Sequence, residues 1–390
     1  KQQRQQQRQQ QQHAETAATM TKRVVIIGAG SGGTAVAGVL DKRPEVDLTL
    51  VDRRECMVHK IGGLRAAAQP DWQKKVLVPR DKLLKRGKLV RNTVSVVNAT
   101  EVVFEDGTKL PYDILVCATG SNNASPGEPP AGAVTLKDMQ AFYSATSAAI
   151  KRAKSIAIIG GGAVGVELSG ELRSVAPDTK IALVHGSDKL LSLSRPPLPE
   201  AFQRKVKQQM ASLNIDLHLG AKADLSPADF GDKPFLEGER TIKLANGKTV
   251  QADLVFNCMG NKLATSMYPA EWLDEHQAVK VAPTLLVNGT KNVFALGDIT
   301  DIEESKLSYI ASRGHAPVVA ANVLAVAKGA PPSKTHKPAT KPMMVVPLGS
   351  RKGVMVTPVG TFGPFLASQV KGKDLFVSMS WSANNAKAPR

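Results

Sequence analysis

The sequence predicts an α/β protein with two Rossmann-like dinucleotide-binding domains and a small C-terminal α+β domain. Three observations support this prediction. A glycine-rich motif directly follows an apolar run, a second copy of that motif occurs later in the chain, and a strand-like segment ends in Gly297-Asp298. The chain has 390 residues, which is enough for two or three domains with their own cores.

The first glycine motif lies in KRVVIIGAGSGG, where Gly28, Gly30 and Gly33 have G-x-G-x-x-G spacing. The apolar run before it predicts a buried strand, and the small apolar residues after it predict a helix. Such glycines allow a tight turn, a close approach of the backbone to a pyrophosphate, and close packing of helix on strand. Asp52 ends the next apolar run, about 20 residues further on, where a carboxylate can accept hydrogen bonds from a ribose. A purely structural glycine turn is the alternative interpretation.

The same pattern then repeats. SIAIIGGGAVG contains Gly160, Gly162 and Gly165 in the same spacing, and IALVHGS matches LTLVDRR. NGKTVQADLVFNCMGN likewise matches DGTKLPYDILVCATGS. The Asn-Gly and Asp-Gly pairs that open these two segments predict hairpin turns. Each half therefore contains a strand, a glycine turn, a helix, a second strand, a hairpin and a returning strand, so the chain contains two dinucleotide folds.

Two dinucleotide folds in one chain predict that NAD(P)H gives a hydride to a bound FAD, since the cofactors supply the reactivity. FAD is expected in the first fold, with Asp52 on its adenosine ribose and Asp298 on its ribityl hydroxyls. NAD(P)H is expected in the second fold. There His185 replaces the acidic residue that would repel a 2′-phosphate, so both nucleotides are expected to serve, with a preference for NADPH.

The number and spacing of the cysteines exclude several kinds of site. There are three cysteines, with no C-x-x-C motif and no His/Cys cluster, so no disulfide scaffold, zinc site or iron–sulfur site is expected and no metal is assigned. Only Cys56 follows the first Rossmann unit closely, which argues against dithiol chemistry. The electron acceptor is then a quinone, oxygen or a one-electron carrier. No apolar run approaches the ~18 residues of a membrane span.

The net charge of +17 is concentrated in two segments. Residues 71–91 contain eight Lys/Arg and two Asp, and residues 331–390 contain nine Lys/Arg and one acidic residue, Asp374. Such segments can bind a peripheral anionic membrane surface or an acidic protein, or can be ordinary solvated surface. Nucleic-acid binding is not expected, because there is neither a basic helix nor an aromatic RNA-binding platform.

These patterns predict five regions. Residues 1–20 form a Gln-rich leader that cannot build a core and is expected to be disordered. The others are the first part of the FAD-binding domain (21–130), the NAD(P)H-binding domain (131–265), the second part of the FAD-binding domain (266–330) and the basic C-terminal domain on the quinone and membrane side (331–390).

The two glycine motifs, Ala118-Thr119-Gly120 and Gly297-Asp298 resemble the apoptosis-inducing-factor and type II NADH dehydrogenase flavoproteins. More narrowly, VDRRECMVHKIGGLRA (51–66), KLSYIA (306–311) and KDLFVSMSW (373–381) resemble the ferroptosis suppressor branch of that family. This resemblance implies an FAD-dependent NAD(P)H:quinone oxidoreductase that produces radical-trapping hydroquinones. It also implies a cytoplasmic monomer or homodimer that is peripheral on membranes, at a mitochondrial or lipid-droplet surface.

Motif positions and the resemblance together give the expected site. The expected cofactor-binding residues are Gly28, Ala29, Gly30, Ser31, Gly32, Gly33, Asp52, Arg65, Val94, Thr119, Gly120, Gly160, Gly162, Gly165, His185, Gly260, Gly297 and Asp298. Arg65 is expected near the pyrophosphate, with a surface arginine as the alternative, and the backbone of Val94 is expected near the adenine.

Three residues are catalytic candidates. Lys306 is expected to stabilise the reduced flavin electrostatically, Glu167 to lie near the nicotinamide, and His59 to lie near the flavin. The alternative for Glu167 is a favourable interaction with its helix dipole, and for His59 a structural role. Phe376 is expected to line the quinone pocket, with ordinary core packing as its alternative. Tyr309 and His315 are weaker candidates for proton donors.

Two other functions stay open on the sequence alone. One is an NAD(P)H-dependent reductase that feeds a soluble iron–sulfur or haem protein docked on the basic segments. The other is a nucleic-acid-binding or redox-sensing flavoprotein whose flavin is regulatory.

Overall fold

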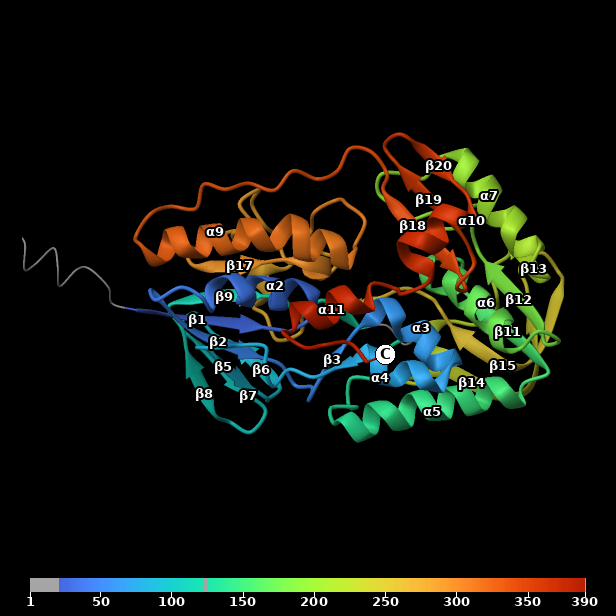
Figure 1. Cartoon of the computed structure of the whole chain (residues 1–390), viewed down its shortest axis with the longest axis horizontal. Coiled ribbons are helices and arrows are strands. Elements are labelled where there is room, and N and C mark those ends of the chain that lie inside the picture. The colour runs from blue at the N-terminus through green and yellow to red at the C-terminus, as the bar shows by residue number, and fades with distance from the viewer. Residues whose placement is uncertain (1–20, 123–124, 390) are drawn as a thin grey trace, which may run out of the picture.

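The computed structural model describes residues 21–122 and 125–389. The predicted disordered leader, residues 1–20, lies outside the described residues. Two five-stranded sheets stand side by side, and a smaller three-stranded sheet lies next to the second of them (Figure 1). The predicted α/β fold with two Rossmann-like domains is thus observed.

The first sheet has the strand order β17-β9-β1-β2-β5, and all of its neighbouring strands are parallel. Its strands are β1 (Lys22–Ile27), β2 (Val46–Val51), β5 (Lys88–Val90), β9 (Ile114–Cys117) and β17 (Val293–Ala295). Val24 and Ile26 pack toward the helices α2 (Ser31–Leu40) and α9 (Ala316–Ala327). Val25 and Ile27 pack toward the other face, because successive side chains of a strand point in opposite directions.

An antiparallel sheet covers that other face of the first sheet (Figure 1). Its strands are β6 (Val94–Val97), β7 (Glu101–Phe104) and β8 (Lys109–Pro111). Asp106-Gly107 forms the predicted turn between β7 and β8, and Gly107 has a positive φ of 80°.

The second sheet has the order β13-β12-β11-β15-β14, with β14 antiparallel to β15 and the other pairs parallel. Its strands are β11 (Ser155–Ile159), β12 (Lys180–His185), β13 (Ile215–Leu219), β14 (Phe235–Lys243) and β15 (Thr249–Asn257). The helices of this part are α5 (Leu136–Arg152), α6 (Ala163–Val175), α7 (Glu200–Ala211) and α8 (Pro227–Phe230). The whole sheet lies between β9 and β17 in the sequence, so the first fold is interrupted by the second.

The C-terminal segment does not build a core of its own. It contains β18 (Met344–Leu348), β19 (Lys352–Thr357), β20 (Gly360–Phe362), α10 (Pro364–Ala367), a π-helical turn (Ser368–Gly372) and α11 (Val377–Ala383). Val346 and Leu348 belong to the same hydrophobic cluster as Leu168 and Leu172 of α6. Gly170 of α6 permits this contact, because a Cβ there would lie 2.4 Å from the Leu348 backbone. The expected C-terminal domain is therefore an extension of the second lobe.

Short elements join the lobes. They are β3 (Met57–Val58) paired with β4 (Leu77–Val78), β10 (Ser121–Asn122) paired with β16 (Lys262–Leu263), α3 (Lys60–Ala68) and α4 (Gln73–Val76). Three 3₁₀ turns complete the set: Pro70–Trp72, Ala270–Trp272 and Gly297–Ile299. Helix α3 contacts both α5 and α6, and α11 contacts α2, so chain segments from both ends of the sequence meet at the junction (Figure 1).

One apolar segment is longer than the sequence analysis expected. The continuous helix Ile310–Ala327, a π-helical turn followed by α9, has the length and mean hydropathy (1.2) of a membrane span. In the structure Val318, Val319 and Val323 are buried in the core of the first sheet. We therefore interpret it as a core helix.

Candidate functional site

A cavity opens at the carboxyl edge of the first sheet, where β1, β9 and β17 end and where α/β sheets bind ligands. Many of the predicted residues line it: Gly28, Gly30, Ser31, Gly32, Asp52, His59, Val94, Thr119, Gly120, Gly297 and Asp298. It is also lined by several polar residues that were not predicted: Arg53, Arg54, Lys60, Arg80, Ser121, Asn122 and Glu128.

The glycine turn has the geometry that the motif requires. Gly28 has a φ of 101°, and a Cβ on it would lie 2.4 Å from the Ala118 carbonyl oxygen. A Cβ on Gly33 would lie 1.9 Å from the Gly28 oxygen, so helix and strand touch there. Gly30 differs, since a Cβ on it meets no atom of the described protein within 4 Å. Its side faces the cavity, and the missing side chain leaves room for a ligand.

Asp52 is held in place by the protein itself. Its carboxylate accepts the N–H of Ala29 at 2.8 Å and of Arg54 at 2.9 Å, and pairs with Arg80 at 3.0 Å. Burial favours the neutral acid, but Arg80 and the two backbone donors outweigh it and lower the pKa of Asp52. These three contacts leave about one of its four lone-pair positions for a ribose hydroxyl. The prediction gave Asp52 the ribose alone and missed its role in fixing the turn.

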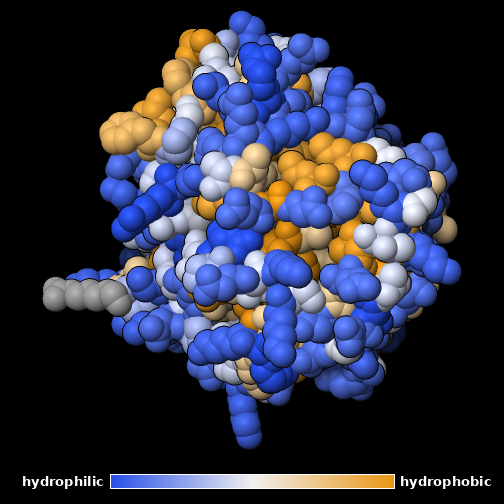
Figure 2. All heavy atoms as spheres, turned by 90° about the vertical axis from the view of Figure 1, so that its right-hand side faces the viewer, coloured by the Kyte–Doolittle hydropathy of each residue, from blue (hydrophilic) through white to orange (hydrophobic). Residues whose placement is uncertain are grey.

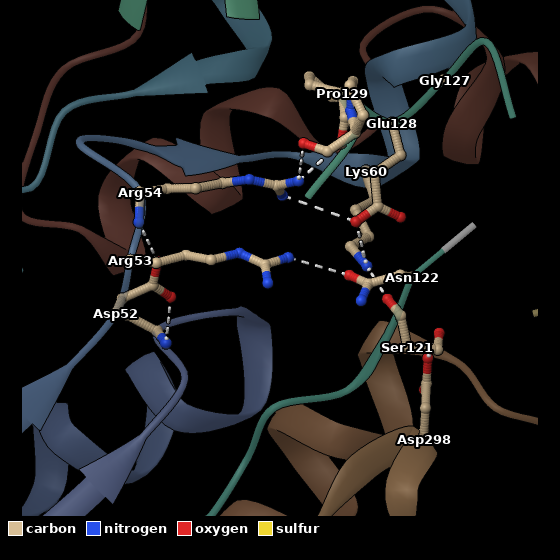
Figure 3. Close-up of polar contacts among 12 residues, drawn as sticks. Asp52, Arg53, Arg54, Lys60, Ser121, Asn122, Gly127, Glu128, Pro129 and Asp298 are labelled. Atoms are coloured by element: carbon tan, nitrogen blue, oxygen red, sulfur yellow. Dashed lines mark hydrogen bonds and ion pairs between the residues drawn. The ribbon is translucent and has the colours of Figure 1, made fainter. Parts of the chain in front are cut away.

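Four cationic side chains line the cavity: Arg53, Arg54, Lys60 and Arg80. Figure 3 shows the first three. Lys60 pairs with Glu128 at 2.8 Å and donates to the Ser121 carbonyl at 2.6 Å. Arg54 lies 3.6 Å from Glu128 and donates to the Pro129 carbonyl at 2.7 Å. Among the described residues, Arg53 has no carboxylate within ion-pair distance, and its guanidinium donates to the Asn122 amide oxygen at 3.1 Å.

Two of these guanidiniums also have an unused donor. The Nε–H groups of Arg54 and Arg80 are buried and meet no acceptor within the described part of the chain. A buried donor without a partner is costly, and an anionic ligand in the cavity would satisfy it. Together with the open side of Gly30, these donors fit the pyrophosphate of a dinucleotide such as FAD.

Asp298 lies at the other end of the cavity, where its carboxylate accepts the Ser121 hydroxyl at 2.7 Å (Figure 3). Its neighbour Gly297 has a φ of 80° and lies two residues beyond the end of β17, at the sheet edge. Thr119 also lines the cavity and donates to the Ala264 carbonyl at 2.6 Å. The segments that follow β9 and β16 thus meet at this end of the cavity.

The second glycine turn has the same geometry as the first. Gly160 has a φ of 119°, with the Cys258 carbonyl oxygen 2.2 Å from where its Cβ would lie, and a Cβ on Gly165 would lie 1.9 Å from the Gly160 oxygen. Gly162 is open, as Gly30 is. His185 lies against Gly161, and its Nε2 is buried without a partner among the described residues. Burial lowers the pKa of His185, so its ring is neutral at pH 7. Gly260 turns the chain here with a φ of 71°.

The structure does not place Arg65 in the cavity. The side chain is 2 % exposed, and its guanidinium pairs with Glu171 of α6 at 2.7 Å and donates to the Lys373 carbonyl at 3.2 Å. The ring of Trp72 lies 4.6 Å away from it. Arg65 thus joins α3, α6 and the C-terminal segment. The expected position of Arg65 beside the pyrophosphate is therefore wrong, because Arg65 pairs with Glu171 instead. The sequence analysis did not connect these two residues.

Lys306 is also turned away from the cavity. Its ammonium donates to the carbonyl oxygens of Thr300 at 2.9 Å and Ile302 at 2.8 Å, and burial lowers its pKa. Lys306 therefore stabilises the loop that follows Asp298 through contacts within that loop. The sequence analysis had expected its ammonium beside the edge of a flavin.

Glu167 lies in the second turn of α6, outside the lining of the cavity, and pairs with Lys371 of the C-terminal segment at 2.7 Å. Burial raises the pKa of the Glu167 carboxyl even though Lys371 opposes the shift. Lys371 was not singled out by the sequence analysis, because one lysine in a basic segment gives no distinguishing signal.

His59 connects the cavity with the C-terminal segment. It lines the cavity, is 4 % exposed, and donates its Nε2–H to the Leu375 carbonyl at 2.7 Å. Leu375 and Phe376 both have positive φ, at 49° and 59°, which is strained for residues with side chains. Phe376 is half-buried beside this contact and precedes α11.

The three cysteines are all buried. Burial raises the pKa of Cys56 to about 11 and that of Cys117 to about 12, so neither provides a reactive thiolate at neutral pH. This agrees with the expectation that the protein does not use dithiol chemistry.

Known proteins are similar to this chain in sequence and in fold. Residues 22–323 match the family described as pyridine nucleotide-disulphide oxidoreductase. Apoptosis-inducing factor homolog B of Dictyostelium discoideum is 33% identical over 386 residues, covering 94% of this chain and 98% of that protein. Ferroptosis suppressor protein 1 of Taeniopygia guttata is 30% identical over 378 residues, covering 94% and 97%. The solved sulfide:quinone oxidoreductase of Aquifex aeolicus shares the fold, with a TM-score of 0.70 at 19% identity over 94% and 93% of the two chains.

The predicted family and cofactors are thereby confirmed, since oxidoreductases of this family use FAD and NAD(P)H. The two glycine turns, the cation-rich cavity and the matched family lead to one conclusion. The chain belongs to the pyridine nucleotide-disulphide oxidoreductase family, within the group that contains the apoptosis-inducing factor homologues and ferroptosis suppressor proteins, and is an FAD-dependent pyridine nucleotide oxidoreductase.

Proposed function

We propose that this protein is an NAD(P)H:quinone oxidoreductase. Bound in the cavity at the first sheet, FAD would supply the redox chemistry, which is to accept a hydride from NAD(P)H and to deliver two electrons to a quinone that takes up two protons to become the hydroquinone. The observation that carries the proposal is the cavity itself. Its residues fit a dinucleotide, and His59 joins it directly to the strained Leu375-Phe376 segment.

The chain's own residues bind and orient the cofactors. The Gly28–Gly33 turn supplies backbone N–H groups at the start of α2, and Arg53, Arg54 and Arg80 supply positive charge for the pyrophosphate. Asp298 and Ser121 face the ribityl end. The open Gly162 and the neutral His185 serve NAD(P)H in the second fold, where no acidic side chain stands at the ribose position to repel a 2′-phosphate.

Three observations favour a quinone over a protein thiol as the acceptor. The three cysteines are buried and protonated. Phe376 lies at the end of the His59 contact, where an aromatic side chain suits a quinone ring. The relatives include a ferroptosis suppressor protein, and a solved structure of the same fold is a sulfide:quinone oxidoreductase.

The surface of the C-terminal segment favours docking on an anionic membrane. Six of its large apolar side chains are exposed, namely Val359 (87%), Phe365 (72%), Met379 (52%), Met343 (47%), Val370 (42%) and Leu366 (38%). Figure 2 shows apolar side chains projecting at the upper edge of the molecule, the end where β20 and α10 lie in Figure 1. Nine Lys/Arg in residues 331–390 supply the charge that anionic headgroups attract.

The deciding experiment follows the flavin absorbance at ~450 nm in an anaerobic stopped-flow instrument. NADPH or NADH is expected to bleach the holoprotein, and a short-chain ubiquinone is expected to restore the absorbance. Bleaching without recovery would move the acceptor to oxygen or a carrier protein. A folded protein that takes up no FAD would reject the proposal.

Membrane docking needs a separate experiment, flotation with vesicles that contain phosphatidylserine. Wild-type protein is expected to float with these vesicles and to be released by salt. The double variant Phe365→Glu/Leu366→Glu should remain in solution. Equal flotation of both proteins would place the docking surface elsewhere.

A further inference from the structure

A buried series of hydrogen-bonding groups leads from the wall of the cavity to the strap, which is the segment between α9 and β18 (residues 328–343). Gly297, which lines the cavity, donates its backbone N–H to His315 Nδ1 at 3.0 Å. His315 Nε2 lies 2.6 Å from one carboxylate oxygen of Glu304, and the other oxygen lies 3.0 Å from His336 Nε2. The side chains of His315 and Glu304 are each 2 % exposed. The role assigned to this series below rests on the proposed function, in which the cavity binds FAD.

The partners determine the tautomer of His315. A backbone N–H can only donate, so Nδ1 must be the unprotonated nitrogen that accepts it. The ring proton is then on Nε2, where it is donated to Glu304. Burial favours the neutral form of Glu304, but the hydrogen bonds from His315 and His336 outweigh it and lower the pKa of this carboxyl.

The same three side chains have the composition of a metal site. Their ligand atoms all lie within 4.8 Å of one another, which the sequence analysis did not anticipate. Binding of a metal at His315 Nε2 would displace its proton. The ring would then need a proton on Nδ1, opposite the Gly297 N–H, or would have to become an anion. Metal-bound histidines instead use the second nitrogen as a donor, so the Gly297 contact argues for a hydrogen-bond chain.

We infer that Glu304 is a positioning residue for the cofactor cavity. It holds His315 in the tautomer that accepts the Gly297 N–H, and so fixes the Leu296-Gly297 peptide, directly before Asp298, at the wall of the cavity. Lys306 strengthens the same loop through the carbonyls of Thr300 and Ile302.

The chain of contacts also reaches the strap toward the C-terminal segment. His336 carries the second contact to Glu304, and its backbone N–H donates to the Pro283 carbonyl at 2.8 Å. Asn322 of α9 holds the neighbouring strap residues by accepting the N–H groups of Ser333 and Lys334. The carboxylate of Glu304 therefore connects the cavity wall to a chain segment that touches no part of the cavity.

The first experiment measures the dissociation constant of FAD from the full-length protein by flavin fluorescence, with no nicotinamide and no quinone present. His315→Leu removes the acceptor for Gly297, whereas His315→Asn keeps an acceptor at the position of Nδ1. Glu304→Leu removes the acceptor for His315, whereas Glu304→Gln keeps an amide oxygen there. The two Leu variants are expected to raise the dissociation constant roughly tenfold, and the Asn and Gln variants by no more than about threefold.

His218→Leu is the matched control, because His218 pairs with Asp216 on the second sheet, away from the cavity. It is expected to leave FAD binding unchanged. Equal losses in His315→Leu and His315→Asn, with both proteins folded by circular dichroism, would overturn the inference. So would wild-type affinity in Glu304→Leu. If wild-type protein binds FAD and all variants match it, only this inference fails, whereas a wild-type protein that binds no FAD rejects the proposed function as well.

A second measurement needs no variant. The imidazole ¹⁵N chemical shifts of His315 distinguish the protonated from the unprotonated nitrogen, and the proton is expected on Nε2. A proton on Nδ1 would overturn the inference. Stoichiometric zinc in the purified protein that is lost in Glu304→Gln would also overturn it, because the cluster would then be a metal centre.

Discussion

His59 Nε2 and the backbone carbonyl of Leu375 form a buried hydrogen bond of 2.7 Å between the cavity and the C-terminal segment. The carbonyl can only accept, so the ring carries its proton on Nε2. Burial lowers the pKa of His59, although the Leu375 carbonyl opposes the shift. The neutral ring is thus the native form at pH 7.

This contact predicts a pH dependence of stability. Below the ordinary His pKa of 6.5 the unfolded chain binds a proton that the native ring resists, so wild-type protein loses stability as the pH falls. His59→Gln keeps a donor but does not titrate. Between pH 7.5 and pH 5, urea unfolding should show an extra wild-type loss of up to about 2 kcal/mol. Parallel pH profiles for the two proteins would contradict the prediction.

Substitution of Gly30 should separate folding from cofactor binding. Gly30 has a φ of −76° and an open side, so Gly30→Ala should change the unfolding free energy by less than about 0.5 kcal/mol. Its methyl group would fill the space for the pyrophosphate, so FAD binding should weaken roughly tenfold or more. Gly33→Ala is the comparison, because its Cβ would overlap the Gly28 oxygen and destabilise the fold by about 1–3 kcal/mol. Unchanged FAD affinity in Gly30→Ala would place the pyrophosphate elsewhere.

Arg53 is one of four cavity cations that the sequence analysis did not select. Arg53→Met should weaken FAD binding roughly tenfold, and Arg53→Lys by less, because lysine keeps the charge without the planar fork. The exposed Arg43 provides the control variant Arg43→Met, which should bind as wild type does. Isothermal titration of apoprotein with FAD at two salt concentrations measures these differences. An Arg53→Met protein with wild-type affinity at both concentrations would remove Arg53 from the site.

The buried pair of Arg65 and Glu171 predicts a non-additive effect on stability. Arg65→Met leaves the Glu171 carboxylate buried and unpaired, and should cost about 3–5 kcal/mol. The double variant Arg65→Met/Glu171→Leu should recover most of that loss, because neither charge is then left alone. Guanidinium unfolding of the four proteins of this cycle measures the coupling. If Arg65→Met instead lost FAD at unchanged stability, Arg65 would contact the cofactor after all.

Phe376 should affect the second half of the reaction only. Phe376→Ala is expected to raise the quinone KM while leaving flavin reduction by NADPH nearly unchanged. Phe376→Gly removes the same ring but relieves the positive φ of 59°, so it should be more stable than the Ala variant by about 1 kcal/mol. Steady-state kinetics and thermal unfolding of both variants separate the ring from the backbone. Loss of flavin from both would show that the ring is needed for folding.

The parts of the site that follow from local sequence were predictable. Gly28, Gly30 and Asp52 have a fixed spacing within one strand-turn-helix-strand unit, and the same unit recurs at Gly160 and Gly162. The edge of a parallel sheet then brings Gly120 and Asp298 to the same cavity, as the topology requires.

The corrections concern contacts between distant elements. Arg65 and Lys306 have the right charge for a cofactor, but their partners are Glu171 and two backbone carbonyls that no local pattern identifies. Arg53 was overlooked although it follows Asp52 directly, and Arg80 was counted only as part of a basic segment. Whether a cation faces a ligand or a carboxylate depends on packing across 50 or more residues of sequence, as in the contact from Arg80 to Ala29.

The close contact at Gly170 determines whether the C-terminal segment can be removed without unfolding the rest of the protein. Since β18 rests directly on the α6 backbone there, and Leu348 shares a core with Leu168, a deletion of residues 331–390 would strip the apolar covering from a lobe that lies far earlier in the sequence. A shortened chain would then lose nucleotide binding through misfolding, with no bearing on membranes or quinones. Point substitutions on the exposed side of α10 are therefore the sound way to examine the C-terminal segment.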